Sequence, residues 1–138
     1  MKKLILFLII SVGVISCKKN NTNTQTINDP VNPGAVVLVK GNFSGNMSYS
    51  VNGTAEIVNN VNQKQLVLKG FSSNSGPDLK VYIATSREAS TFINLGPLKS
   101  TNGQQVYDIS GMPDFNQYKF VLIWCQQFSV LFGSAELK

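Results

Sequence analysis

The stretch YKFVLIWC, residues 118–125, decides the fold of this 138-residue chain. It is a nearly uninterrupted run of apolar residues, rich in aromatic and β-branched side chains. A run of this length and composition predicts a central strand that is buried on both faces. After a polar break, residues 128–137 predict the closing strand, in which Phe128, Val130 and Phe132 would alternate as a buried face.

Toward the amino terminus, turn signals alternate with short β-branched and aromatic runs. Asn52-Gly53 stands between two such runs, residues 47–51 and 54–58, and predicts a two-residue hairpin turn. Residues 86–92 fit either a helical turn or a longer loop. This pattern predicts a β-sandwich or β-barrel. The remaining strands are expected at residues 36–43, 65–71, 79–83 and 104–109.

The amino terminus has the organisation of a secretory signal. Lys2 and Lys3 form a short basic start, and residues 4–15 are almost wholly apolar. About a dozen residues are too few to span a bilayer, which takes roughly 20. The next residues, Val14-Ile15-Ser16-Cys17, resemble the bacterial lipobox. That resemblance implies removal of residues 1–16 and lipidation of Cys17 with diacylglycerol and a further acyl chain such as palmitate. The alternative is an ordinary signal peptide that is cleaved nearby and leaves Cys17 as a free thiol.

The same resemblance implies a lipoprotein of the bacterial cell envelope, anchored on the exported side of a membrane in the periplasm or at the outer membrane. Its partner there would be the lipid bilayer. Residues 17–34 then comprise the lipidated Cys17 and a flexible tether, because they are rich in Asn, Thr and Gln and include Pro30 and Pro33. Residues 35–138 are expected to form one domain. With Cys17 lipidated, Cys125 is the only other cysteine, so this domain has no intrachain disulfide.

The charge of the chain argues against a nucleic-acid partner. The chain has 12 basic and 7 acidic residues, and without Lys2 and Lys3 the excess falls from +5 to +3 (10 − 7). From Ala35 onward there is no basic run. A nucleic-acid-binding domain would show a clustered basic surface.

Motifs spread over residues 35–138 resemble those of the DM-thirteen domain family. The two most specific are Gly76-Pro77-Asp78-Leu79 and Trp124-Cys125-x-x-Phe128. The resemblance implies an electron-transfer domain whose characteristic cysteine corresponds to Cys125. It makes Trp124, Gly76, Pro77 and Asp78 candidate neighbours of the site. The more general spacings are Gly41-x-Phe43, Gly53-x-Ala55, Leu66-x-Leu68, Leu95-x-x-Leu98, Gly103-x-Gln105-x-Tyr107 and Phe132-Gly133-x-Ala135.

Catalytic and metal chemistry find little support in the sequence. The chain contains no histidine, which excludes Ser-His-Asp and Cys-His pairs, histidine-ligated zinc and a proximal-histidine haem. Its carboxylates are scattered without a paired or metal-ligand spacing. Met47 and Met112 are the remaining conceivable partners of Cys125 in a haem or copper site, and nothing in the sequence brings them together. We therefore expect no enzyme, no catalytic residue and no metal site, and the cofactor of the domain stays unknown.

Two interpretations of Cys125 remain open. Redox chemistry requires a thiol that can be reached and positive charge that favours the thiolate. Strand alternation places Cys125 on one face with Val121 and Ile123, and puts Trp124 on the opposite face. The other interpretation is a small apolar core residue, a common role of free cysteine.

These observations lead to two functional hypotheses for a single antiparallel β-sandwich of the DOMON-like or immunoglobulin-like kind. In the first, Cys125 takes part in thiol- or cofactor-linked redox chemistry with a protein of the envelope. In the second, the domain is a non-catalytic binding module for an envelope partner or a small ligand. The loops 72–78, 86–92 and 111–116 would then carry the contacts.

Overall fold

A computed structural model describes residues 25–138 of the protein. These residues form an all-β domain with no helix, as predicted. The predicted signal peptide, Cys17 and residues 18–24 of the predicted tether lie outside the described residues. The strands are β1 (Ile27–Asn28), β2 (Val36–Gly45), β3 (Val51–Asn60), β4 (Gln63–Ser73), β5 (Leu79–Ala84), β6 (Phe92–Pro97), β7 (Asn102–Ile109), β8 (Phe120–Cys125) and β9 (Val130–Glu136). Residues 25–138 accordingly contain no helical segment that is long and apolar enough to cross a lipid bilayer.

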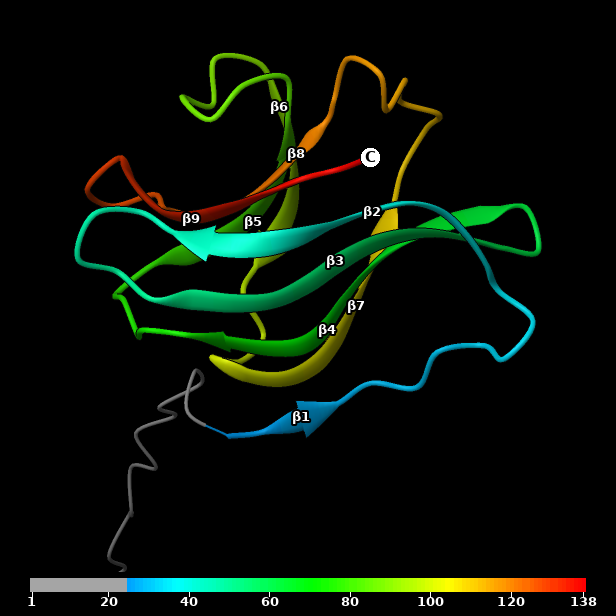
Figure 1. The fold of residues 1–138 in the computed structure, drawn as a ribbon, viewed down its shortest axis with the longest axis horizontal. Helices are drawn as coiled ribbons and strands as arrows, with labels where there is room; N and C mark the ends of the chain where they lie inside the picture. The colour runs from blue at the N-terminus through cyan, green and yellow to red at the C-terminus, as the bar shows by residue number, and fades with distance from the viewer. Residues whose placement is uncertain (1–24) are drawn as a thin grey trace, which may run out of the picture.

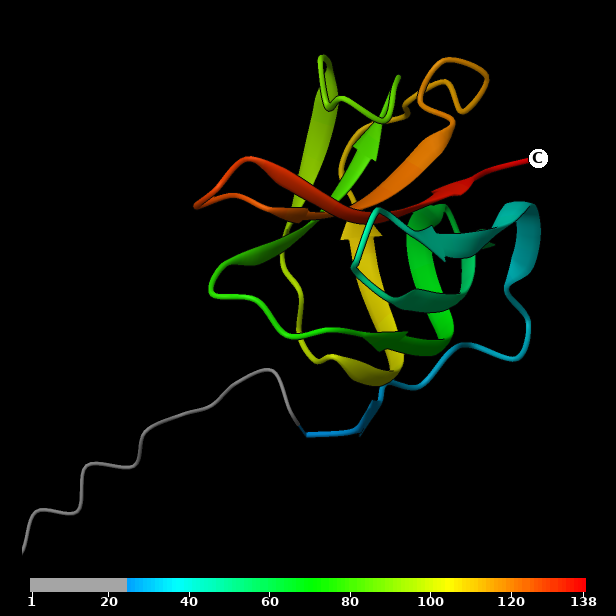
Figure 2. The same ribbon diagram turned by 60° about the vertical axis from the view of Figure 1, so that its left-hand side comes forward.

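The strands form one curled sheet in the order β1-β7-β4-β3-β2-β9-β8-β5-β6. All neighbouring strands are antiparallel except β1 and β7. β2 joins the two halves, because Val36–Asn42 pairs with β3 whereas Phe43–Gly45 pairs with β9. Figures 1 and 2 show the half that contains β5, β6, β8 and β9 above the half that contains β1, β3, β4 and β7.

The main core lies inside the curl and is built by the period-two alternation of the strands. β8 is a central strand, as predicted, and lies between β5 and β9. Its residues Val121 and Ile123 belong to the main core, whereas Leu122 belongs to a smaller cluster on the other face. All three are fully buried, so β8 is covered on both faces, and each such side chain stabilises the fold by about 1.5–3 kcal/mol.

Asn52-Gly53 does not form the predicted hairpin turn. It lies inside β3, where the register against β4 shifts between Asn52 and Thr54. Gly53 has a φ of 110°, and a Cβ there would lie 2.7 Å from the carbonyl oxygen of Lys69. This is a β-bulge, which needs the same backbone freedom as a hairpin turn. The dipeptide therefore gave the wrong prediction.

The β3–β4 hairpin turns at Val61-Asn62 instead. Asn60 pairs with Gln63 across the turn, which leaves a two-residue loop. Val61 and Asn62 have φ values of 45° and 69°. Positive φ at both central residues is the geometry of a type I′ turn, which strongly favours Asn and Gly. Val61 departs from that preference, so the sequence did not mark this turn.

Two further segments complete the comparison with the sequence. Residues 85–91 form an irregular loop between β5 and β6, which settles the choice that the sequence left open. Phe128 is 64% exposed, because residues 126–129 form a turn and β9 begins at Val130. The prediction of a buried Phe128 is therefore wrong, whereas Phe132 is buried in the main core as predicted.

Part of the predicted tether is attached to the domain. Ile27–Asn28 forms β1 and pairs in parallel with Gly103 and Gln104 of β7. Asp29 accepts hydrogen bonds from the Lys99 ammonium at 2.6 Å and from the Val106 amide at 3.0 Å. Burial opposes ionisation of Asp29, but these two donors and the charge of Lys99 outweigh it and lower the pKa of the carboxyl.

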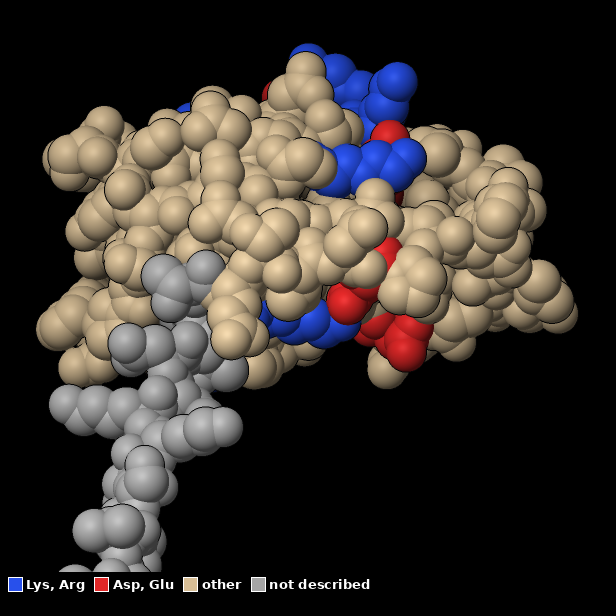
Figure 3. Space-filling model, turned by 90° about the horizontal axis from the view of Figure 1, so that it is seen from below, with Lys and Arg blue, Asp and Glu red and all other residues tan. Residues whose placement is uncertain are grey.

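The charged side chains lie mostly in pairs of opposite sign. Lys69 pairs with Glu56 at 2.7 Å, and Lys99 pairs with Asp29. Figure 3 shows one face of the molecule, on which blue and red groups lie beside one another within a largely uncharged surface.

Candidate functional site

Cys125 is the last residue of β8 and lies inside the main core. It pairs with Leu79 on β5 and with Val130 on β9. It shares the inner face with Val121 and Ile123, as the alternation predicts. Only 1% of its surface is exposed. The question that the sequence left open therefore has a structural answer: the thiol is enclosed by apolar side chains.

The strand pairing brings the two most specific sequence motifs together. Leu79, which ends the first motif, lies opposite Cys125 in the second. The amide of Gln126 donates a hydrogen bond of 2.9 Å to the carbonyl oxygen of Asp78. A Cβ at Gly76 would lie 2.9 Å from atoms of both Leu79 and Phe132. Gly76 is thus where the first motif packs against the core, and Pro77 is exposed in the same loop.

The charges of this region lie on the face opposite the thiol. Lys80 pairs with Trp124 and therefore shares the outer face with it. Its ammonium lies 2.8 Å from Asp78 Oδ1. Leu79 and Val130, the two residues paired with Cys125, are uncharged. Strand pairing therefore gives the sulfur no basic neighbour.

This geometry limits the chemistry that Cys125 can perform directly. Thiolate attack and reagent access require partial exposure, and structural buried cysteines are inert. In the closed fold Cys125 packs as a small apolar residue. The sulfur is therefore out of reach of solvent reagents in the closed fold.

Trp124 lies on the outer face, in a row of aromatic rings rather than in the main core. The ring of Tyr82 stacks on Phe92 with a centroid separation of 4.2 Å, and it lies 6.4 Å from the ring of Trp124. Tyr82 is almost fully buried, whereas Phe92 is 43% exposed. Burial raises the pKa of the Tyr82 hydroxyl, and the charge of Asp78 raises it further against the opposing effect of Lys80. Tyr82 is therefore a neutral phenol at physiological pH.

A pocket of about 450 Å³ lies beside Trp124. Arg87 and Glu88 from the β5–β6 loop line it together with Leu131 and Asn46, and the Asn46 amide donates to the Leu131 carbonyl at 3.1 Å. Sequence reasoning named the loop but not these residues. The adjacent opposite charges of Arg87 and Glu88 could have indicated a binding loop. The strand pairing that brings Trp124 close to them is not visible in the sequence.

The remaining candidates do not converge on Cys125. Met47 and Met112 are 94% and 84% exposed, whereas Cys125 is buried, so the three side chains do not form one ligand set. Within residues 25–138, no group of three His, Cys, Asp or Glu side chains is placed to hold a metal ion.

Comparison with known proteins identifies the domain. No curated protein and no solved structure matches the chain. Residues 42–137 match the family described as "Electron transfer DM13". The match covers 96 of the 138 residues (137 − 42 + 1) and includes both specific motifs and Cys125. The resemblance seen in the sequence is thereby confirmed, and the chain belongs to the electron-transfer DM13 family.

Proposed function

We propose that the protein is a membrane-anchored envelope lipoprotein whose β-domain takes part in electron transfer, with Cys125 as its redox group and with no enzymatic activity of its own. The family match over residues 42–137 carries the proposal, because Cys125 is the only cysteine in that range. Its partners would be the bilayer, through acylated Cys17, and a redox protein of the envelope.

The burial of Cys125 determines how an electron would reach it. Alkylation needs direct contact with the sulfur, whereas an electron can pass between a buried group and a neighbouring side chain. Trp124 would carry the electron between Cys125 and the protein surface, because it is adjacent to Cys125 in the chain and is partly exposed on the outer face. Its aromatic neighbour Tyr82 extends the same route.

Voltammetry and the visible spectrum of the purified protein test the redox role. We expect a redox signal in the wild type that is absent from Cys125→Ala and weakened in Trp124→Leu, with circular dichroism unchanged in both. Cys125→Ser serves as a second variant if the alanine variant is unstable. A wild type without any redox signal or absorbing cofactor would refute the role of Cys125.

The anchor is tested separately. Mass spectrometry of membrane-extracted protein should find Cys17 as the first residue, carrying diacylglycerol and an amide-linked acyl chain. Cys17→Ala should prevent this modification. An unmodified Cys17 in the mature wild type would overturn the lipoprotein assignment and leave the domain's redox role untouched.

The second candidate function is a binding module, which the sealed thiol and the pocket beside Trp124 favour. In that case Cys125→Ala should leave partner binding unchanged, whereas Arg87→Met should weaken it. The opposite pattern would favour the redox function. An electron-transfer partner and a binding partner are thus distinguished with two variants.

A further inference from the structure

The curled sheet has an open end at which three neighbouring strands place an inward-facing row of residues. Asn59 on β3 pairs with Lys64 on β4, and Lys64 pairs with Ile109 on β7. Paired residues share a face, and Ile109 belongs to the main core. Lys64 and Asn59 therefore occupy core-facing positions one pair before the end of the β3–β4 hairpin, where the core opens to solvent.

Lys64 carries a positive charge that the described residues do not neutralise. Each of the ion pairs in residues 25–138 involves another lysine. The Lys64 ammonium lies 5.3 Å from the centroid of the Phe115 ring. A cation–π contact of this kind holds the ammonium in place but leaves its net charge available.

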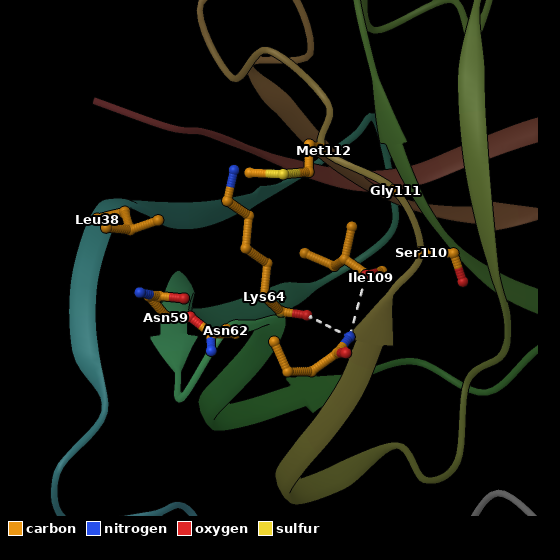
Figure 4. Close-up of a pocket in the computed structure, with 9 residues that line it drawn as sticks. Leu38, Asn59, Asn62, Lys64, Ile109, Ser110, Gly111 and Met112 are labelled. Carbon is orange, nitrogen blue, oxygen red and sulfur yellow. Dashed lines mark hydrogen bonds between the residues drawn. The ribbon is translucent and has the colours of Figure 1, made fainter.

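Lys64 lines an open pocket of about 720 Å³ at this end of the sheet. Figure 4 shows Lys64 reaching from the floor toward Met112, with Leu38 and Asn59 on one side and Ile109 on the other. The walls from Leu38, Ile109 and Met112 are apolar. The rest of the lining is polar and comes mainly from Asn59, Asn62, Gln63 and Ser110. A pocket of this volume that combines apolar side chains, a few polar groups and one charge is typical of small-molecule sites, and the mouth of a curled sheet is a common place for one.

We propose that this pocket binds a small amphipathic carboxylate, a molecule with one anionic group and an apolar body. Its carboxylate contacts the Lys64 ammonium, and its apolar body packs against Leu38 and Met112. A neutral or cationic amphiphile lacks the negative charge that would pair with the Lys64 ammonium. The site uses no residue of the Cys125 region and stands independently of the redox proposal.

The site is accessible on a membrane-anchored protein. β1 pairs with Gly103 at the start of β7, and the Ser100 hydroxyl donates to the Gln25 carbonyl beside it. Ile109 lies six residues further along β7, about 20 Å away. The described chain therefore begins at the end of β7 opposite the pocket.

Calorimetric titration of the full chain carrying Cys17→Ala, with octanoate as the probe, tests the proposal. We expect octanoate to bind at least tenfold more tightly than octan-1-ol, and octylammonium to show no binding. Lys64→Met should lower octanoate affinity at least tenfold, to the level of the alcohol. Met112→Ser should weaken octanoate and octan-1-ol alike, because it alters only the apolar wall.

The matched control is Lys40→Met, which removes a lysine from β2 that does not line this pocket. It should leave octanoate affinity unchanged, and so should Cys125→Ala. Amide NMR spectra establish that each variant is folded. Equal affinities for octanoate and octan-1-ol, absence of octanoate binding, or unchanged binding in folded Lys64→Met would overturn the proposal.

Discussion

At the scale of single residues, the main core contains one polar network that must be complete to be tolerated. Gln105 is fully buried. Its Oε1 accepts hydrogen bonds from the Tyr107 hydroxyl at 2.7 Å and the Ser100 amide at 3.3 Å, and its Nε2 donates to the Ser100 carbonyl at 2.7 Å. The Tyr107 oxygen in turn accepts from the Lys99 amide at 3.0 Å. Burying such groups costs little only when each has a partner.

Tyr107→Phe should therefore destabilise the protein by about 1–3 kcal/mol, because it leaves the Lys99 amide unpaired and leaves Gln105 Oε1 with only the 3.3 Å bond from the Ser100 amide. Urea unfolding measures the change. Tyr118→Phe is the control, since Tyr118 packs only at the edge of the core and its hydroxyl takes no part in the network. Equal stability of Tyr107→Phe and wild type would show that water replaces the missing hydroxyl.

Residue positions along one strand could be predicted from the sequence, but contacts between strands could not. Alternation alone placed Cys125 and Trp124 on opposite faces. The approach of Asp78 to Gln126 depends on β5–β8 pairing, which joins segments far apart in the chain. Lys64 is a clearer case: its inward position follows from the register, yet at a strand end a lysine has the same sequence pattern as a solvated one.

At the scale of elements, the β3–β4 turn stores strain that a substitution can remove. Val61 has a φ of 45° and is 82% exposed. A β-branched residue pays a steric cost in this region, whereas Asn adopts it readily. Val61→Asn should stabilise the domain by about 1 kcal/mol, which raises Tm by about 4 °C. Calorimetry measures the shift, and Val61→Thr, which keeps the β-branch, should not reproduce it.

Turn residues show why element boundaries were the weakest part of the sequence prediction. A glycine with positive φ is equally suited to a hairpin turn and to a β-bulge. The sequence of Asn52-Gly53 therefore predicts a hairpin turn where the structure has a β-bulge. Val61 carried no turn signal at all. The apolar run of β8 was predicted well because burial on both faces requires an uninterrupted apolar sequence, which few other structures produce.

The attachment of β1 should depend on pH through Asp29. Because the pKa of Asp29 is lowered in the folded protein, its contribution is complete above its ordinary pKa of 3.8 and is lost as the pH falls through the folded value. At neutral pH, Asp29→Asn should weaken the attachment by up to about 1 kcal/mol. Hydrogen exchange of the Asp29 amide, which donates to the Gln104 carbonyl at 2.9 Å, reports it.

Asp108→Asn is the control for Asp29→Asn. Asp108 lies on β7 and accepts a hydrogen bond from Gln65. The substitution Asp108→Asn therefore removes a carboxylate from β7 without affecting the contacts of β1. The prediction fails if the Asp29 amide exchanges at the same rate in wild type and in Asp29→Asn, at neutral pH and at acid pH. That result would show that strand pairing alone holds β1 in place.

At the scale of the whole molecule, one continuous core couples distant parts of the fold. The main cluster draws residues from both halves of the sheet, including Ile57 on β3, Val81 on β5 and Cys125 on β8. β2 connects these halves covalently through its change of partner. Neither half of the sheet can open without exposing the inner face of the other half. Access to the Cys125 sulfur should therefore require global unfolding.

Because of this cooperativity, the alkylation rate of Cys125 should respond to a substitution in the distant β3–β4 turn. If alkylation proceeds through global unfolding, the 1 kcal/mol gained by Val61→Asn should slow labelling of Cys125 by about fivefold. The rate should be measured where it is proportional to reagent concentration, so that it reports the unfolding equilibrium. An equal labelling rate in Val61→Asn and wild type, despite the higher Tm, would mean that the turn at residues 126–129 opens by itself. A locally opening turn would then give redox partners direct access to the sulfur.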